Sequence, residues 1–588
     1  MPRPGHNGRM PQANDAAAAL LNEYAELHLM TGGDQFRARS YEKAARAVAG
    51  LAQDVSRLSP AELQQIPGVG KAIAGKITEI NAIGTFAELE RLRAEIPDGV
   101  LQLTRIPALG PKRALTLYRE LHVSSPEELR DAIKAGRLAG LRGFGAKSEE
   151  KLLSGIELLE STSGRVLLNV ADEAADRVVE AISAVPGCLR CAPAGSLRRF
   201  AETIGDVDVL AAADDSGPLM AALTSLPETE AVIAAGPAKT SVRTAAGLQV
   251  DLRVVPLDSW GAAWQYFTGS QAHNVAVREI AVRKQLKLSE YGLFHAAGGE
   301  KIVSRTEEEV YQRLGMEWIP PTLREHSGEV AAALRGDLPS VVTEQDIRGD
   351  LHTHTNLTDG VATLEDMVAR AQARGYAYYA VTDHAPNLVM QRMTDEKMLA
   401  QREQVRRLGS SLAASAGGEP MVLLHGTELN IAPDGTVDWP AEFLDGFDVC
   451  VASVHSHFDQ SRPAMTRRFI AACENPHVNV IGHPLARKIG RRPPVDVDLP
   501  ELFRACARTG TALEVNAHPN RLDLPSAHIR PARDAGVKFA IDSDAHFVGG
   551  LDYLRYGVGT AQRGWLTPDD VINAWPLPRL REFLRKGR

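Results

Sequence analysis

Cysteine is scarce in this chain, with five residues among 588. A small, odd number of cysteines does not support a disulfide scaffold. Long apolar runs are also missing, since no segment approaches the roughly 20 apolar residues that a membrane helix needs. The polar stretch 1–14 lacks the apolar core of a signal peptide. We therefore expect a cytoplasmic protein with no membrane partner.

Excess positive charge is missing as well, because the formal net charge is −8. This excludes a nonspecific polycation, although a local basic surface could still bind nucleic acid. The length exceeds what one hydrophobic core fills and predicts several domains. Cys188 and Cys191 form a lone Cys-x-x-Cys. Because no second pair completes a zinc site, we interpret them as strand packing.

Between residues 15 and 165, three glycine-containing turns join short predicted helices. Each turn would expose backbone N–H groups at a helix N-terminus, where they can bind a phosphate without reading a base. One such turn is only a helix corner, whereas three indicate binding to a DNA backbone. Ala108 replaces a glycine in the second turn. The predicted DNA-binding residues are Gly68, Gly70, Lys71, Gly110, Gly143 and Gly145.

Three carboxylates form a second pattern. Asp206 and Asp208 alternate on a predicted strand, so their side chains point to one face. Asp251 interrupts another apolar strand, where a carboxylate has little structural reason to be. Together they could hold two Mg²⁺ or Mn²⁺ ions for nucleotidyl transfer. The preceding Gly195-Ser196-Leu197-Arg198-Arg199 strengthens this interpretation; the alternative is a related fold that binds nucleotide without catalysis.

These segments resemble family X DNA polymerases, with their lyase, fingers, palm and thumb regions. The resemblance implies that Asp206, Asp208 and Asp251 bind metal and that Asp251 accepts the primer proton. The implied nucleotide-binding residues are Ser196, Arg199, Tyr266, Gly269, Asn274 and Arg278. Lys76 falls at the position of a lysine that forms a Schiff base with 5′-deoxyribose phosphate; a plain surface lysine is the alternative. Gln249 departs from the family by replacing an arginine near the primer phosphate.

Between residues 346 and 546, seven apolar runs each end on histidine or carboxylate. The C-terminal ends of parallel strands share one mouth in a β/α barrel, so these ends predict a polymetal site. The pattern resembles the polymerase-and-histidinol-phosphatase (PHP) domain. That resemblance implies three Mn²⁺, Zn²⁺ or Fe²⁺ ions, with Glu428 bridging two of them. The implied ligands are His352, His354, Asp359, His384, Glu428, His455, His483, Asp544 and His546.

Six basic residues follow strand ends on the same expected face of the barrel. They could hold a nucleic-acid backbone or could equally be solvated surface charges. They are Arg467, Arg468, Arg487, Lys488, Arg491 and Arg492. His425, Asp383 and His518 are left out of the metal set and are expected to lie around it.

The expected fold is a multidomain α/β protein with helical hairpins, a nucleotidyltransferase palm and thumb, and a distorted (β/α)₇ barrel. The expected domains are a lyase-like helix-hairpin-helix domain over 1–90, fingers over 91–165, palm over 166–258, thumb over 259–325, a linker over 326–346 and the PHP barrel over 347–588.

The expected function is repair DNA synthesis on gapped or nicked duplexes from deoxynucleoside triphosphates. The barrel would be a 3′→5′ exonuclease that also attacks abasic sites or 3′-phosphates, and the chain is expected to be monomeric. Two alternatives remain open. The chain could be chiefly a structure-directed nuclease with a weak polymerase half, or the barrel could hydrolyse a small phosphomonoester.

Overall fold

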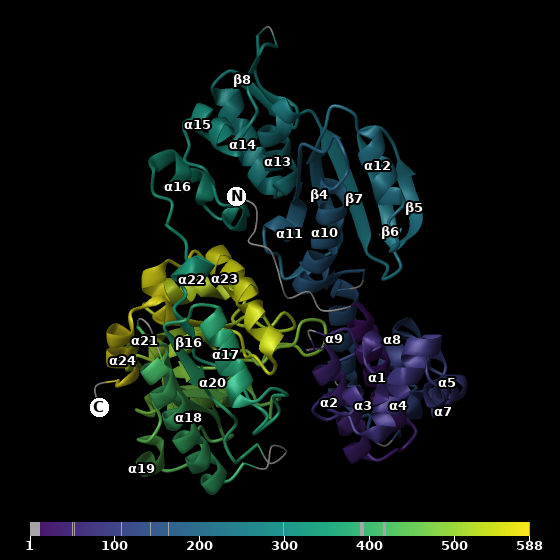
Figure 1. The fold of residues 1–588 in the computed structure, drawn as a ribbon, viewed down its shortest axis with the longest axis vertical. Helices are drawn as coiled ribbons and strands as arrows, with labels where there is room; N and C mark the ends of the chain where they lie inside the picture. Colours follow the sequence, from purple (N-terminus) through teal and green to yellow (C-terminus); the bar gives the residue numbers. More distant parts are fainter. Residues whose placement is uncertain are drawn as a thin grey trace.

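The computed structural model describes residues 12–49, 51, 53–107, 109–141, 143–162, 164–297, 299–388, 393–415 and 419–586. Figure 1 shows the N-terminal helices, in purple, beside the C-terminal barrel, in green and yellow, with the central sheet and its following helices above them. Ala108 lies outside the described residues. Within the described part of the chain, no helix is long and apolar enough to cross a membrane.

The N-terminal region is entirely helical. Its helices are α1 (Gln12–Met30), α2 (Gln35–Ala49), α3 (Pro60–Leu63), α4 (Lys71–Ile83), α5 (Ala87–Glu95), α6 (Asp98–Leu103), α7 (Pro111–Leu121), α8 (Pro126–Lys134) and α9 (Ala146–Thr162). They share one core. α4, α7 and α9 begin directly after Gly70, Gly110 and Gly145, the three predicted turn positions. Gly68 and Gly143 have φ of +84° and +92°, a conformation that side chains other than glycine rarely adopt.

The central region is a five-stranded sheet in the order β2-β4-β7-β6-β5. Its strands are β2 (Arg190–Pro193), β4 (Asp206–Ala212), β5 (Thr229–Ala235), β6 (Lys239–Thr244) and β7 (Gln249–Val255), with a small ribbon of β1 (Val166–Leu167) and β3 (Thr203–Ile204) beside it. Helices α10 (Leu168–Ser183) and α12 (Gly217–Thr224) cover one face through a shared apolar core. α11 (Gly195–Arg198) precedes β4, and α13 (Trp260–Thr268) packs on the other face. β4 therefore packs apolar side chains on both of its faces, and Asp206 and Asp208 lie at its beginning.

The thumb region follows the sheet. It contains α13, α14 (Gln271–Arg283), β8 (Leu286–Ser289), β9 (Gly292–His295), β10 (Lys301–Val303) and α15 (Glu307–Arg313). Arg198 from α11 makes a two-pronged contact with Glu307, at 2.7 Å for both nitrogens, and so ties palm to thumb. The expected linker contains α16 (Glu329–Arg335), which packs into the thumb core. Glu329 also lies 2.7 Å from Nδ1 of His273.

The C-terminal region has seven parallel strands in sequence order. They are β11 (Gly349–Asp350), β12 (Tyr378–Val381), β13 (Val422–Asn430), β14 (Val449–Ser453), β15 (Val480–Ile481), β16 (Ala512–Asn516) and β17 (Phe539–Asp542). A parallel bridge between Thr353 and Ala545 joins the ends of the first and last strands, so the barrel is nearly closed. The outer helices are α17 (Leu364–Ala373), α18 (Asp395–Ser415), α19 (Ala441–Leu444), α20 (Arg462–Glu474), α21 (Leu499–Thr509), α22 (Ser526–Asp534), α23 (Leu554–Arg563) and α24 (Leu577–Leu584).

The barrel contacts the other regions through charged pairs and apolar packing. Arg555 on α23 pairs with Asp172 on α10, and Leu522 and Tyr556 belong to the core of the palm. Lys151 on α9 lies 3.2 Å from Asp459, in the loop that follows β14. The helical region and the loops at the mouth of the barrel therefore lie side by side, as Figure 1 also shows for α9.

Candidate functional site

The three predicted palm carboxylates converge on one point. Strands β4 and β7 are parallel, and Asp208 pairs directly with Asp251 in their register. One oxygen from each of Asp206, Asp208 and Asp251 lies within 4.8 Å of the others. Burial, followed by the charges of Asp206 and Asp251, raises the pKa of Asp208 to about 6. Repulsion of this kind is what bound divalent cations would relieve, so the donor set fits Mg²⁺ or Mn²⁺.

Lys239 on β6 supplies a charge beside this triad that the sequence did not reveal. Its Nζ lies 2.5 Å from Oδ2 of Asp251. Burial would raise the pKa of Asp251, but hydrogen bonds from Lys239, Ser241 and Gln249 hold it below its usual value. Gln249, the residue that departs from the family pattern, donates to Asp251 Oδ1 at 3.0 Å. It therefore helps to orient the Asp251 carboxylate.

Gly195 allows the loop before β4 to approach the triad. Its φ is +61°, and a Cβ at this position would lie 2.3 Å from Oδ2 of Asp208. Only glycine fits so close a passage of backbone over a carboxylate. Ser196 follows at once on α11, and half-buried Arg199 ends the turn beyond it. The glycine that begins the Gly195-Ser196-Leu197-Arg198-Arg199 motif is therefore required by the close approach of the Asp208 carboxylate.

The predicted nucleotide-binding residues gather between palm and thumb. Arg199 donates to the backbone oxygen of Thr268 at 2.5 Å and to Glu325 at 3.0 Å. Asn274 donates to the backbone oxygen of Tyr266 at 2.7 Å. Gly269 and Arg278 complete the predicted set. A Cβ on Gly269 would lie 3.2 Å from Nη1 of Arg199. Arg278 is exposed and lies one turn of α14 beyond Asn274.

The barrel gathers the other predicted ligands at the ends of its strands. Three groups of side chains each place their donor atoms within 4.8 Å of one another, and two histidines, His354 and His384, belong to two groups each. The groups are His354, Asp359, His384 and His546; His352, His354 and Asp544; and His384, Glu428 and His455. His483 joins them through Nε2, which lies 3.1 Å from Oε1 of Glu428. Three overlapping groups are what three neighbouring ions require.

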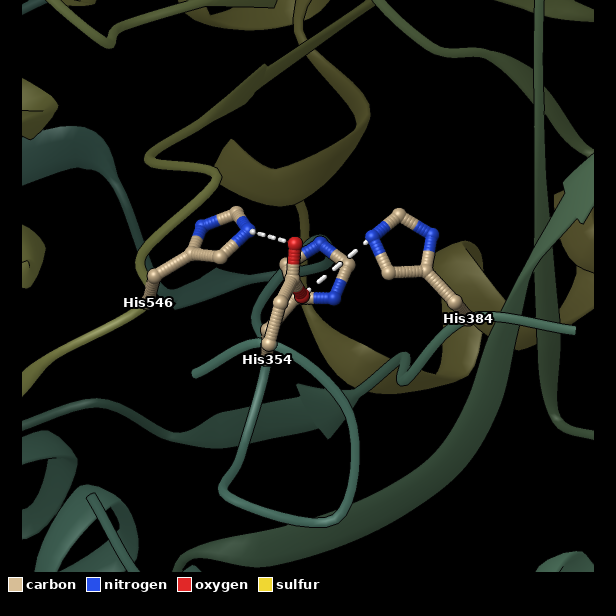
Figure 2. A group of neighbouring side chains, drawn as sticks. His354, His384 and His546 are labelled. Carbon is tan, nitrogen blue, oxygen red and sulfur yellow. Dashed lines mark ion pairs between the residues drawn. The ribbon is translucent and has the colours of Figure 1, made fainter. Parts of the chain in front are cut away.

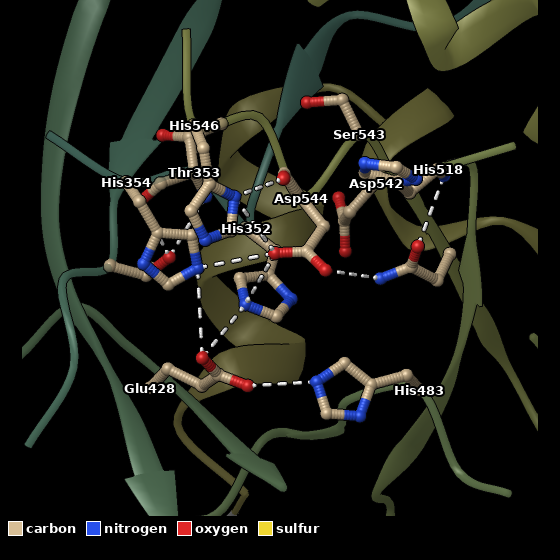
Figure 3. Close-up of polar contacts among 12 residues, drawn as sticks. His352, Thr353, His354, Glu428, His483, His518, Asp542, Ser543, Asp544 and His546 are labelled. Carbon is tan, nitrogen blue, oxygen red and sulfur yellow. Dashed lines mark hydrogen bonds and ion pairs between the residues drawn. The ribbon is translucent and has the colours of Figure 1, made fainter. Parts of the chain in front are cut away.

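Carboxylates link the histidines within this cluster. The oxygens of Asp359 lie 3.3 Å from Nε2 of His384 and 3.3 Å from Nε2 of His546. Figure 2 shows the rings of His354, His384 and His546 gathered at this point. Figure 3 shows Glu428 between His483 and the pair formed by His352 and His354. Oε2 of Glu428 also lies 2.9 Å from Nδ1 of His384. Glu428 therefore faces two of the three groups, as a bridging ligand would.

The cluster has the properties of a metal site. Nε2 of His352 and both ring nitrogens of His354 are buried and form no hydrogen bond within the described residues. Burial and the charges of His546 and His384 lower the pKa of His354 to about 4, so its ring stays neutral and able to bind metal. Buried, unpaired ring nitrogens are costly unless a ligand satisfies them. These residues fit Mn²⁺, Zn²⁺ or Fe²⁺.

Residues outside the predicted set orient these ligands. Nδ1 of His352 lies 2.6 Å from Oε1 of Glu514, and Nδ1 of His455 lies 2.8 Å from Oδ1 of Asn430. Such contacts fix the ring so that Nε2 faces the ion. Glu514 interrupts the apolar run of β16, a signal that could have identified it from sequence. Asp383, in contrast, accepts hydrogen bonds from Thr355 and Gln401 and shapes the loop beside the site.

Known domain families match individual regions of the chain, and one known protein matches nearly its whole length. Four domain families match: a helix-hairpin-helix domain over residues 12–86, a SAM-like helix-hairpin-helix tandem over 100–157, the DNA polymerase beta thumb over 263–325 and the PHP domain over 350–518. The chain is 34% identical over 572 residues to the DNA polymerase/3′-5′ exonuclease PolX of Bacillus subtilis (strain 168), covering 97% of this chain and 98% of that protein. The chain belongs to the family X DNA polymerases that carry a C-terminal PHP domain.

Other relatives match one half each. DNA polymerase lambda of Rattus norvegicus is 28% identical over 322 residues, which cover 50% of this chain and 53% of that protein. A probable phosphatase of Yersinia pestis (strain Pestoides F) is 28% identical over 249 residues, which cover 41% of this chain and 95% of that protein. The two candidate sites of this family X polymerase thus have separate relatives.

Lys76, the candidate lyase residue of this polymerase, is 7% exposed. Its Nζ lies 2.6 Å from Oε2 of Glu88 and 5.0 Å from the centre of the Phe86 ring. Lys76 is therefore not the plain surface lysine of the alternative interpretation. Nucleophilic attack by this amine would require Nζ to leave its ion pair with Glu88.

The hairpin residues of this polymerase are presented to solvent. Gly68, Gly70 and Lys71 are exposed at the start of α4, and Gly110 is exposed at the start of α7. Gly143 and Gly145 are exposed at the start of α9. Free N–H groups and an accessible lysine are what a DNA backbone contact needs.

Proposed function

We propose that this chain is a gap-filling DNA polymerase and a metal-dependent 3′→5′ exonuclease. The observation that carries the proposal is the presence of two distinct ligand clusters, three carboxylates on the palm sheet and nine side chains at the barrel mouth. The polymerase/exonuclease name of the Bacillus subtilis relative, which matches nearly the whole chain, supports both halves.

In the polymerase half, Asp206, Asp208 and Asp251 would hold two divalent cations, which activate a primer hydroxyl and offset charge on a leaving pyrophosphate. Asp251 would also accept the proton of the primer hydroxyl. Arg199, with Ser196, would bind the triphosphate. Tyr266 and Gly269 would contact the sugar of the nucleotide. Asn274 and Arg278 would contact the nucleotide and the minor groove of the template.

In the exonuclease half, the nine side chains would hold divalent metal ions, which would supply Lewis-acid chemistry for hydrolysis of a phosphodiester. Glu428 would be one of the ligands, and Glu514 would keep His352 turned toward the cluster. The DNA itself would be held by the exposed turns of α4, α7 and α9, which bind the backbone without reading sequence.

The test uses a duplex with a one-nucleotide gap and a labelled primer, with and without triphosphates in Mn²⁺. Wild type should extend the primer with triphosphates and degrade it without them. Asp251→Ala should abolish extension alone, and His352→Ala with Glu428→Ala should abolish degradation alone. Extension that survives Asp251→Ala removes the polymerase assignment. If Asp206→Ala with Asp208→Ala changes no activity on DNA, the chain is chiefly a nuclease.

We also propose that the barrel removes a 3′-phosphate from DNA, an activity that the match to a probable phosphatase favours. A 3′-phosphorylated primer should become extendable by the same enzyme. Histidinol phosphate is the comparison substrate, and faster turnover of that compound than of the DNA end would reverse the assignment. Incision at abasic sites belongs to the same proposal and is measured on a duplex with one such site.

We propose Lys76 as a lyase nucleophile that acts once substrate phosphate displaces Glu88. Borohydride should trap a covalent complex between the wild-type enzyme and 5′-deoxyribose phosphate. Lys76→Ala should abolish trapping, whereas Glu88→Gln should increase it because the ion pair that holds Nζ of Lys76 is lost. Trapping that persists in Lys76→Ala contradicts the assignment.

A further inference from the structure

Four of the six predicted basic residues around the barrel mouth have different surroundings in the structure. Arg468 is buried and donates to the backbone oxygens of Ile431 and Ser456, so it holds two loops together. Arg487 pairs with Glu202 of the palm at 2.6 Å and therefore belongs to the domain interface. Nε of Arg492 donates to the backbone oxygen of Ala486 within its own loop at 2.6 Å, while its guanidinium and the Lys488 side chain join no carboxylate in an ion pair within the described residues.

Lys488 and Arg492 lie together beside Arg521, and the three are called here the cationic triad. An antiparallel bridge pairs Lys488 with Arg492, so their side chains leave the same side of the loop. The guanidinium of Arg492 lies 4.1 Å from the centre of the Phe458 ring. Nε of Arg521 lies 3.5 Å from Oδ2 of Asp544, one of the nine predicted ligands. The cationic triad thus adjoins the cluster without belonging to it.

The cationic triad has more cations than carboxylates within ion-pair distance, since of its three residues Arg521 is paired, with Asp544, in the described part of the chain. Burial, followed by the charges of Arg521 and Arg492, lowers the pKa of Lys488 to about 8. Among the described residues, no carboxylate lies within ion-pair distance of Lys488 or Arg492. Nη1 of Arg521 is buried and has no hydrogen-bond partner in the described part of the chain. Three half-buried cations held this close favour an anion between them.

The anion that fits is a phosphate. Guanidinium groups match its oxygens in a two-pronged geometry, and the lysine adds a point charge. The nine-residue cluster would itself hold the phosphate under attack, through its ions. Arg521 of the cationic triad contacts that cluster through Asp544, so the triad is placed for a neighbouring phosphate of the same molecule. A nucleic-acid strand has such a neighbour, whereas a small phosphoester has none.

We propose that Lys488, Arg492 and Arg521 bind a second phosphate of the DNA strand, next to the phosphate that is hydrolysed. The inference rests on the proposed exonuclease function and adds the reason why the barrel selects a polynucleotide. Arg521 positions the strand and Asp544 together, and Lys488 and Arg492 contribute to affinity for the strand.

The test compares two substrates that differ in their number of phosphates. One is a 5′-labelled single-stranded oligonucleotide, and the other is thymidine 5′-(4-nitrophenyl phosphate), which has a single phosphorus. Lys488→Ala with Arg492→Ala should raise KM for the oligonucleotide roughly ten-fold or more, as expected when two phosphate contacts are lost. The dependence of log KM on log salt should become shallower by roughly 0.7 for each contact. kcat/KM for the nitrophenyl ester should stay within two-fold of wild type.

Two variants serve as controls. Arg504→Ala removes an exposed arginine from outer helix α21 and should change neither substrate. Lys488→Arg keeps the charge and should retain a KM near wild type. Metal content and melting temperature, measured on every variant, identify any loss of folding or of the ions.

The outcomes separate the inference from the function on which it rests. Equal losses on both substrates would place the cationic triad at the attacked phosphate and overturn the inference, while leaving the exonuclease intact. An unchanged KM for the oligonucleotide in the double variant would also overturn it. A wild-type enzyme that hydrolyses the nitrophenyl ester but not DNA would overturn the proposed exonuclease, and the second phosphate site with it.

Discussion

Replacing Gly195 by alanine should disable the polymerase site and leave the barrel site active. The new Cβ would lie 2.3 Å from Oδ2 of Asp208. Because ordinary contact begins near ~3.5 Å, the carboxylate would have to move by about 1 Å. A displacement of about 1 Å at a catalytic group can reduce the rate roughly 100-fold. We therefore expect primer extension to fall by about two orders of magnitude.

The same substitution also strains the backbone, and this effect needs its own control. Gly195 has φ of +61°, where alanine costs roughly 1–2 kcal/mol in the free energy of unfolding. Gly187 is a matched position in the palm, since its φ is +93° and a Cβ added there would have no described atom within 4 Å. Gly187→Ala should therefore lower stability by a similar amount while extension stays near wild type.

Single-turnover extension of a gapped duplex measures the polymerase, and degradation of the same primer without triphosphates measures the barrel. Thermal unfolding of both variants measures the strain. If Gly195→Ala extends primers at more than a third of the wild-type rate, Asp208 is not held against the loop as the structure indicates. If Gly187→Ala loses extension equally, strain and not displacement is the cause.

Three further perturbations test other parts of the sites. Asp208→Asn should raise the melting temperature of the metal-free protein above about pH 6. Burial and neighbouring carboxylates raise the pKa of Asp208 to about 6, so its charged form is disfavoured in the folded protein. The gain in melting temperature should shrink as the pH falls from about 6 toward 3.8, because Asp208 then becomes protonated in the wild-type protein. Glu428→Gln should remove transition metal, measured by elemental analysis, and slow 3′→5′ degradation roughly 100-fold or more, whereas exposed Glu442→Gln should do neither. Arg563→Ala should raise the polymerase KM for triphosphate about two- to five-fold, because Glu325, which Arg563 contacts at 2.8 Å, would then pair more strongly with Arg199, the arginine proposed to bind the triphosphate. Unchanged stability, retained metal or an unchanged KM would contradict the respective prediction.

The fold class followed from periodicity. Seven apolar runs with polar ends predicted seven parallel strands, and the barrel has these strands in sequence order. Family comparisons also confirm the helical hairpins and the thumb. Strand alternation likewise predicted that Asp206 and Asp208 share a face, because side chains two residues apart on a strand point the same way. These signals depend on residues close together in the sequence, so they can be recognised without the tertiary structure.

Other features of the sites left no local signal. Lys239 lies on a strand that neighbours Asp251 only in the assembled sheet, and nothing in its own segment marks it. Arg521 lies in the loop that follows β16, and its charge acts on Lys488 because the barrel brings two loops together. The role of Glu325, between an arginine of the palm and Arg563 of the barrel, depends on an interface that no single segment encodes.

The sequence by itself determined which residue types are available at each strand end, and hence that this chain has two metal-type sites and helical hairpins. The tertiary structure alone decided which charges pair with one another: Lys239 with Asp251, Glu88 with Lys76, and Arg521 with Asp544. The physical reason is distance. Electrostatic energy depends on separation and burial in space, and residues far apart in order acquire both only when the strands pair and the domains pack.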